Sequence, residues 1–377
     1  MAPRALVTGS AGFIGYHLCE ALLAEGWQVA GIDDLNPYYD PALKAARHDR
    51  LARHRGFCAH LGSIANAGTV AAAADRAAPE VIVHLAAQAG VRYSIDNPRA
   101  YLDANVTGSF NVMEAARAHG VRHLLMASTS SVYGAGTDMP YAETQKADTQ
   151  MSFYAATKKA GEAMAHAWAH IHGVPVTMFR FFTVYGPWGR PDMAYFKFTR
   201  AILEGRPIDV YNHGRMRRDF TYVGDLVRAV RLLIDVPPLG PDARGQTAPG
   251  ASAAPGSSPA PGAVAPGDSL SPVAPWRVVN IGNSRSVPLE DFIAALEAAL
   301  GRLAQRRYMD MQPGDVPATW ADASLLRHLT GYAPRTPLAE GVAAFVDWYR
   351  AYHAIDADGT TDSTAGGSAT GGTGSVS

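Results

Sequence analysis

Short apolar runs alternate with longer, mixed stretches along most of the chain. The run at residues 80–87 is nearly uninterrupted, which is typical of a parallel strand buried on both faces. Stretches between the runs, such as 43–55 and 105–119, read as helices. Strands that alternate with helices predict an α/β fold with a doubly wound parallel (Rossmann) sheet. The runs that predict its strands lie at residues 5–8, 28–32, 57–61, 80–87, 121–128 and 174–180.

Two stretches lack the apolar residues that a core requires. Residues 237–275 are mostly Pro, Ala, Gly and Ser, and the end of the chain is rich in Gly, Ser and Thr. Because such segments bury too little apolar surface to offset the entropy of ordering, we expect a disordered insertion at 237–275 and a disordered tail at 356–377. Other predicted elements are strands at 207–211 and 276–282 and helices at 196–205, 289–305 and 338–353.

Composition and charge exclude several classes of function. The 377 residues are 47% hydrophobic and carry a formal net charge of −1, which argues against a nucleic-acid partner. Cys19 and Cys58 show neither metal-ligand spacing nor a disulfide framework, and no apolar run approaches the roughly 18 residues of a membrane span. We therefore expect a soluble, cytoplasmic protein without a metal site or a membrane segment.

Three glycines, Gly9, Gly12 and Gly15, directly follow the first apolar run. Between a strand and a helix this spacing allows a tight turn and close approach of a pyrophosphate to the backbone. The glycines alone are a weak signal, and their place in the chain strengthens it. Asp33 follows the second strand, where a carboxylate binds an adenosine ribose and repels an added phosphate, so we expect NAD rather than NADP. Asp33 also fits a turn residue at a strand end.

Tyr154 and Lys158 lie four residues apart in a stretch that reads as a helix, so their side chains share one face. A nearby ammonium favours the phenolate and lowers the tyrosine pKa from about 10 toward neutrality, so that Tyr154 can act as a general base. A solvated helix pair has the same spacing. Residues 128–131 add a cluster of hydroxyls after the strand at 121–128, although surface loops are often rich in Ser and Thr as well.

A glycine motif, an acid after the second strand, a Ser/Thr cluster and Tyr-x-x-x-Lys, in this order, resemble the extended short-chain dehydrogenase/reductases. Three longer and more specific motifs, at residues 84–94, 181–194 and 217–222, closely resemble those of the UDP-glucuronate 4-epimerases. The resemblance extends from residue 4 to about 350, apart from the insertion. It implies an NAD-binding Rossmann domain at residues 1–180 and a smaller α/β substrate-binding region at 181–355. Within the second range, a segment at about 215–236 is expected to pack on the Rossmann domain again.

The resemblance also implies a reaction and its residues. An epimerase of this kind retains NAD and converts UDP-glucuronate to UDP-galacturonate through a 4-keto sugar. Tyr154 would be the base, Lys158 would lower its pKa and bond the nicotinamide ribose, and Thr129 would bond the reacting oxygen. The implied cofactor-binding residues are Gly9, Gly12, Phe13, Ile14, Gly15, Asp33, Ser63, Ile64, Leu85, Ala86, Ala87, Asn105, Ser128, Tyr154, Lys158 and Phe181. The implied substrate-binding residues are Gln88, Arg92, Ser130, Thr183, Arg190, Arg218 and Asp315.

Among the substrate-binding residues, Arg190 matters most, because a guanidinium can hold the sugar carboxylate bidentately and the family places this position and Thr183 near that group. Without the resemblance, Arg190 would read as a surface arginine in a proline-rich loop. The resemblance further implies a homodimer through the helices at 105–119 and 154–172, and a role in supplying precursors for capsule or exopolysaccharide.

Several alternatives stay open. A neutral-sugar 4-epimerase for UDP-glucose or its N-acetyl relative is the nearest, but such enzymes commonly carry asparagine at the position of Thr183. Dehydratases and decarboxylases of the family carry acids where this chain has Ser130 and Ser131, and a catalytically silent NAD-sensing protein would not need Tyr154. Ser63 and Gly224 stand where the family usually carries aspartate. A serine contacts adenine more weakly than a carboxylate does.

Overall fold

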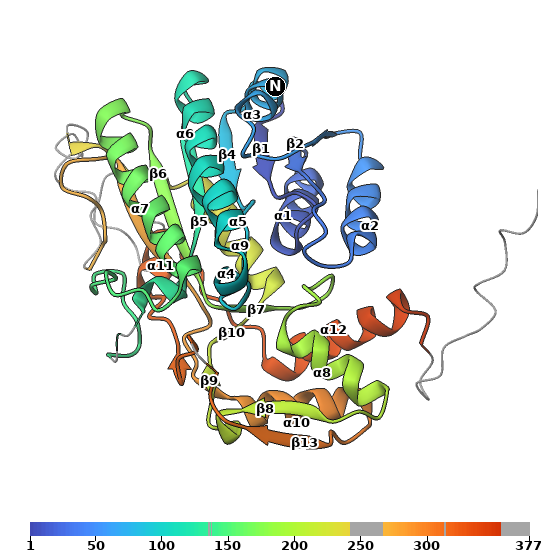
Figure 1. The fold of residues 1–377 in the computed structure, drawn as a ribbon. Helices are drawn as coiled ribbons and strands as arrows, with labels where there is room; N and C mark the ends of the chain where they lie inside the picture. Colours follow the sequence, from blue (N-terminus) through green and yellow to red (C-terminus); the bar gives the residue numbers. More distant parts are fainter. Residues whose placement is uncertain (135, 137, 242–266, 313, 356–377) are drawn as a thin grey trace, which may run out of the picture.

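The computed structural model describes residues 1–355 except 135, 137, 242–266 and 313. Seven parallel strands form its central sheet in the order β11-β6-β5-β4-β1-β2-β3, which confirms the predicted doubly wound sheet (Figure 1). The strands are β1 (Arg4–Thr8), β2 (Gln28–Asp33), β3 (Phe57–Leu61), β4 (Val81–His84), β5 (His123–Thr129), β6 (Val176–Phe181) and β11 (Trp276–Ile281). All four residues of β4 are buried, as its apolar run predicts.

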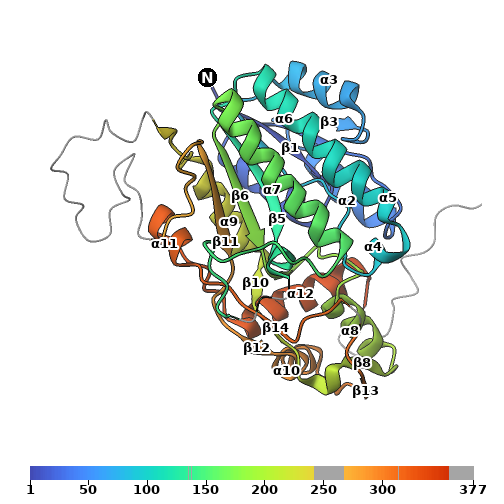
Figure 2. The same cartoon turned by 60° about the vertical axis from the view of Figure 1, so that its left-hand side comes forward.

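Helices cover both faces of this sheet. The strand order reverses between β1 and β4, so the carboxyl ends of these strands open onto the crevice where doubly wound sheets bind ligands. One face packs on α1 (Phe13–Ala24), α9 (Val223–Ile234) and α11 (Ser324–Thr330), with α2 (Pro41–Ala52) beside α1. The other packs on α3 (Ala67–Ala77), α6 (Ser109–Ala118) and α7 (Phe153–His172), which lie side by side in Figure 2.

A second, smaller core lies beyond the carboxyl ends of the strands, in the lower part of Figure 1. Its helices are α8 (Ala194–Leu203), α10 (Leu289–Leu300) and α12 (Leu338–Tyr352), and its paired strands are β8 (Ile208–Tyr211) and β13 (Arg306–Met309). The short strands β7 (Thr183–Tyr185), β10 (Phe220–Tyr222), β9 (Arg217–Arg218), β12 (Val287–Pro288) and β14 (Ala318–Thr319) connect the two cores. Phe345 and Tyr349 of α12 are buried here, as the apolar face of the last helix suggests.

The predicted helix at 105–119 differs from the observed one. The structure has a π-helix at Leu102–Gly108, followed by α6, and the short helices α4 (Tyr93–Asp96) and α5 (Pro98–Tyr101) precede it. π-Helical turns are rare and occur frequently at functional sites. Short 3₁₀ helices occupy Ser130–Tyr133 and Asn212–Gly214.

The prediction of a disordered insertion at 237–275 is wrong for its last residues. Residues 267–275 pack on the sheet domain, because Asp268 forms a buried ion pair with Arg277 at 3.0 Å and Ser271 lies 2.8 Å from the His166 ring of α7. These are polar partners that composition alone does not reveal. Residues 242–266 and the predicted tail at 356–377 lie outside the described residues. Strand β11, which the sequence analysis assigned to the substrate-binding region, is an edge strand of the main sheet.

No helix of the described ranges combines the length and the apolar character needed to cross a bilayer.

Candidate active site

The glycine turn between β1 and α1 forms the floor of a cleft at the switch point of the sheet. Gly9 has a φ of 75°, and a Cβ there would lie 2.8 Å from the backbone nitrogen of Ala86. A Cβ at Gly15 would lie 1.9 Å from the carbonyl oxygen of Gly9, so the helix can approach the turn this closely only without a side chain. The cradle therefore fits a pyrophosphate held on backbone amides at the N-terminus of α1.

Asp33 stands at the end of β2 and faces this turn. Its carboxylate accepts hydrogen bonds from the backbone of Ala11 at 3.0 Å and of Leu35 at 2.9 Å, and burial raises its pKa. The residue therefore shapes a turn at the strand end while its side chain also lines the cleft. Lys44 of α2 lines the same cleft and donates to Asn36, a contact that the sequence analysis missed.

Nearly all of the implied cofactor-binding residues line this one cleft. Asn105 is the exception: it lies behind the cleft and exchanges two hydrogen bonds with the backbone of Gln88 at 2.9 and 3.0 Å. The π-helix thus uses Asn105 to fix the segment after β4. The residues that line the cleft are Gly9, Gly12, Phe13, Ile14, Gly15, Asp33, Ser63, Ile64, Leu85, Ala86, Ala87, Ser128, Tyr154, Lys158 and Phe181. Gln88, implied as a substrate contact, lines this cleft too.

Tyr154 and Lys158 project from the first two turns of α7, where Ser152 caps the helix by accepting from the Ala155 backbone. Burial raises the pKa of Tyr154, and hydrogen bonding to Thr129 and the charge of Arg190 oppose that rise. Lys158 donates instead to the carbonyl oxygen of Ala127 at 2.7 Å, and burial lowers its pKa to about 8. In this structure the influences that oppose the rise of the Tyr154 pKa come from Thr129 and Arg190, and a lowering by Lys158 stays a prediction.

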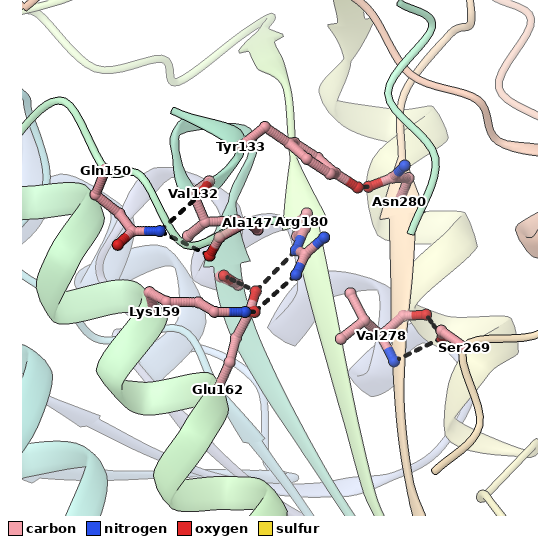
Figure 3. Close-up of polar contacts among 11 residues, drawn as sticks. Val132, Tyr133, Ala147, Gln150, Lys159, Glu162, Arg180, Ser269, Val278 and Asn280 are labelled. Carbon is pink, nitrogen blue, oxygen red and sulfur yellow. Dashed lines mark hydrogen bonds and ion pairs between the residues drawn. The ribbon is translucent and has the colours of Figure 1, made fainter. Parts of the chain in front are cut away.

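A buried ion pair holds α7 against the strands behind these residues. Glu162 accepts two hydrogen bonds from the Arg180 guanidinium, at 2.7 and 2.8 Å, and one from the Ser128 hydroxyl at 2.6 Å. In Figure 3 the carboxylate of Glu162 faces Arg180, with Tyr133 on the other side of the guanidinium. Burial opposes ionisation of Glu162, but Arg180 keeps its pKa low. The sequence offered a signal for Glu162, which follows Lys158 by one helical turn.

A second cleft adjoins the first on the side of the smaller core. Six of the seven implied substrate-binding residues line it: Arg92, Ser130, Thr183, Arg190, Arg218 and Asp315. Six residues line both clefts: Tyr38, Thr129, Tyr154, Phe182, Arg190 and Met193. Two molecules, one bound in each cleft, would therefore meet at the Tyr154 hydroxyl.

Arg190 is paired in this structure. Its Nε and Nη2 donate to the two carboxylate oxygens of Asp192 at 3.0 and 2.5 Å, and Tyr38 donates to the same carboxylate at 3.3 Å. Burial would raise the pKa of Asp192, but Arg190 lowers it overall. The resemblance implies that Arg190 binds a ligand carboxylate with this fork, and it gave no indication of Asp192. The only indication of Asp192 in the sequence was its position two residues after Arg190 in the same loop.

Arg92 and Asp315 approach each other from opposite sides of the second cleft. The guanidinium lies 3.3 Å from the Asp315 carboxylate and 4.9 Å from the centre of the Tyr211 ring. Arg218 donates to the backbone oxygen of Pro317 at 3.3 Å, beside the same loop, and burial lowers its pKa. The two guanidiniums, Arg92 and Arg218, suit a diphosphate, whereas the Asp315 carboxylate can accept hydrogen bonds from hydroxyl groups. Across the described ranges, no cluster of His, Cys, Asp and Glu has the arrangement of a metal site.

Comparison with known proteins agrees with this geometry. A model of the NAD dependent epimerase/dehydratase family matches residues 5–244. A protein of Rhizobium meliloti (strain 1021), described as a probable UDP-glucuronate 4-epimerase, is 51% identical over 92% of this chain and 96% of its own. UDP-glucuronate 4-epimerase 4 of Arabidopsis thaliana is 41% identical over 93% and 76%. The crystal structure of the Bacillus cereus UDP-glucuronic acid 4-epimerase with UDP-glucuronic acid and NAD has a TM-score of 0.77, at 29% identity over 92% and 99%.

Proposed function

We propose, because the chain belongs to the NAD dependent epimerase/dehydratase family, that it is an NAD-dependent isomerase that interconverts UDP-glucuronate and UDP-galacturonate at carbon 4. One observation carries the proposal. Tyr154 and Thr129 line both the cleft with the glycine cradle and the cleft that contains Arg190 and Arg218. This junction is where a nucleotide cofactor and a UDP-sugar would react.

Tyr154 acts as the base in the proposed reaction. Its phenolate removes the proton of the sugar 4-hydroxyl, while Thr129 hydrogen-bonds the same oxygen and, in the structure, opposes the rise in the pKa of Tyr154 that burial causes. Bound NAD supplies the acceptor, and later the donor, of the hydride at carbon 4. The 4-keto sugar turns over between the two steps, and Tyr154 then returns the proton to the oxygen. Lys158 lies one helical turn beyond Tyr154 and donates to the Ala127 carbonyl oxygen. From this position it would also hydrogen-bond the nicotinamide ribose.

The anchoring groups lie away from the reacting carbon. Arg92, Arg218 and Asp315 would hold the UDP part, so that the sugar can rotate while the nucleotide stays bound. Thr183, Ser130 and the Nη1 side of Arg190 would bind the sugar carboxylate, because Asp192 occupies the other edge of that guanidinium. Ser130 and Ser131 follow Thr129 directly and provide no carboxylate for moving water, which favours epimerisation over dehydration.

A second candidate function rests on the ion pair between Arg190 and Asp192. Because Asp192 neutralises Arg190, this part of the cleft also suits an uncharged sugar, as in a UDP-glucose 4-epimerase. Incubation of the purified protein with UDP-glucuronate or UDP-glucose, followed by chromatography and a carbon dioxide assay, separates the options. UDP-galacturonate without carbon dioxide is expected. Turnover of UDP-glucose alone would favour the second candidate, and a UDP-pentose with carbon dioxide would mean decarboxylation.

The proposal includes a homodimer in the cytoplasm. Helices α6 and α7 lie side by side and expose Phe110 (43%) and Ile171 (68%), large apolar side chains suited to a helical interface. Both cysteines, Cys19 and Cys58, are free thiols, which supports a reducing compartment. Light scattering after size-exclusion chromatography is expected to give twice the mass of the chain, and a monomer at micromolar concentration would contradict the dimer.

A further inference from the structure

Arg47 of α2 is a fully buried cation that the reaction does not use. Its Nη1 donates to the Ala11 carbonyl oxygen at 2.9 Å and to the Tyr39 hydroxyl at 2.8 Å, and its Nη2 donates to Trp188 and Gly189 carbonyls at 2.6 and 3.0 Å. In the described part of the chain, all four accepting oxygens are neutral. A buried guanidinium without a carboxylate partner is costly, so its charge suggests a role beyond packing.

The four acceptors belong to two loops that serve different clefts. Ala11 lies within the glycine turn that forms the pyrophosphate cradle, between Gly9 and Gly12. Trp188 and Gly189 directly precede Arg190, which faces the second cleft. One planar fork therefore fixes the position of both loops at once.

The loop before Arg190 depends on such support. Trp188 has a φ of 57°, an uncommon conformation for a bulky residue. A Cβ at Gly189 would lie 2.2 Å from the Tyr195 hydroxyl, which accepts from the backbone nitrogen of Arg190 at 3.2 Å. The two hydrogen bonds from Arg47 satisfy carbonyl groups at the strained part of this loop. The position of Arg190 thus follows from the position of Arg47.

We propose that Arg47 is a positioning residue that couples the two clefts, so that NAD binding at the glycine turn strengthens binding of the sugar carboxylate at Arg190. The pyrophosphate would supply the negative charge that the surroundings of Arg47 lack, and the ordered fork would hold the Arg190 loop in place. By linkage, the sugar nucleotide must strengthen NAD binding by the same factor. A lysine cannot replace the guanidinium, because a single ammonium cannot span both loops. The carboxylate part of this proposal rests on the proposed function.

Calorimetry of the full-length protein, freed of cofactor, tests the coupling without turnover. NAD affinity is measured alone and with saturating UDP-glucuronate, for the wild type, Arg47→Met and Arg47→Lys. In the wild type we expect UDP-glucuronate to tighten NAD binding by about 10-fold. In both variants we expect NAD to bind about 10-fold more weakly and the tightening to disappear. Arg53→Met, which removes an exposed cation at the end of the same helix, is the matched control and should behave as the wild type.

Steady-state kinetics and a double-mutant cycle separate positioning from general loosening. Arg47→Lys should raise the KM for UDP-glucuronate by about 10-fold while kcat at saturation changes less than about threefold. In an Arg190→Ala background the same substitution should leave the KM unchanged, because its effect passes through Arg190. Additive effects in the cycle would overturn the proposal, as would an unchanged NAD affinity in Arg47→Lys. If Arg47→Met does not fold, Arg47→Lys decides, with its thermal unfolding recorded alongside.

The two proposals fail in different ways. A wild-type protein that binds NAD but neither binds nor converts UDP-glucuronate would contradict the proposed function. Arg47 would then be judged by NAD affinity alone, where an unchanged value in Arg47→Lys overturns its role at the glycine turn.

Discussion

Tyr154, the proposed base, depends on its neighbours for its pKa. Its pKa is raised by burial and lowered by Thr129 and Arg190, so the phenolate forms only to the extent that these two residues offset burial. Because the phenolate is the reactive form, the rate should rise with pH through this pKa. In the proposed reaction the hydroxyl of Thr129 would be both a partner of the sugar oxygen and a determinant of the pH range of activity.

Removing that hydroxyl should shift the pH profile. In Thr129→Ala the pKa of Tyr154 loses a contact that lowers it, so the rise of kcat is expected at higher pH than in the wild type. We also expect kcat to fall by about 100-fold, the usual effect of losing one donor to a reacting oxygen. Thr129→Ser keeps the hydroxyl and is the control. A Thr129→Ala profile with an unshifted acid limb would show that Thr129 does not influence Tyr154.

Asp192 gives a second test at this scale. In Asp192→Asn the partly buried Arg190 loses its counter-charge, which should lower the free energy of unfolding. The carboxylate of UDP-glucuronate can replace that charge, so it should raise the melting temperature more in Asp192→Asn than in the wild type. UDP-glucose lacks the carboxylate and should show no such difference. Equal shifts with both nucleotides would place the sugar carboxylate away from Arg190.

At the scale of elements, Glu162 and Arg180 join α7 to the central sheet. Helix α7 carries Tyr154 and Lys158, while β5 ends at Ser128 and Thr129, so the bonds from Glu162 to Ser128 and Arg180 fix the helix relative to the strands. Both charged side chains are almost fully buried. Their value therefore lies in the relative position of the catalytic groups, because a buried pair adds little net stability over an apolar one.

Removing one partner of the Glu162–Arg180 pair should cost more stability than replacing both charged side chains by uncharged ones. Arg180→Met leaves Glu162 without its main partner and should lower the free energy of unfolding by about 3–5 kcal/mol. Adding Glu162→Gln removes the stranded charge and should restore part of the loss. Urea unfolding followed by circular dichroism measures both. A loss below about 1 kcal/mol in Arg180→Met would mean that water or another group compensates Glu162.

The sequence predicted the elements of the sheet well because buried parallel strands are continuous apolar runs. It could not predict the π-helix at Leu102–Gly108, because π-helices are rare and the apolar pattern was read with the α-helical period. It also misjudged residues 267–275. Their composition is that of a flexible linker, whereas their order comes from a partner, Arg277, that lies on β11.

At the scale of the whole molecule, two clefts meet over the carboxyl ends of the sheet. The sequence predicted most of the residues that line them, since motif positions follow strand ends and strand ends share one edge of a parallel sheet. It did not predict which partners the charged side chains in the two clefts would contact. The pairing of Arg190 with Asp192, and the turn of Lys158 toward Ala127, depend on side-chain directions that spacing does not fix.

The central claim is that carbon 4 is oxidised and reduced within one active site. The most direct measurement is incubation of the purified protein with UDP-glucuronate that carries deuterium at carbon 4, followed by mass spectrometry and NMR of the products. The account predicts UDP-galacturonate that keeps its deuterium at carbon 4, without exchange with solvent and without carbon dioxide. Loss of the deuterium to water, or no conversion by protein saturated with NAD, would contradict it.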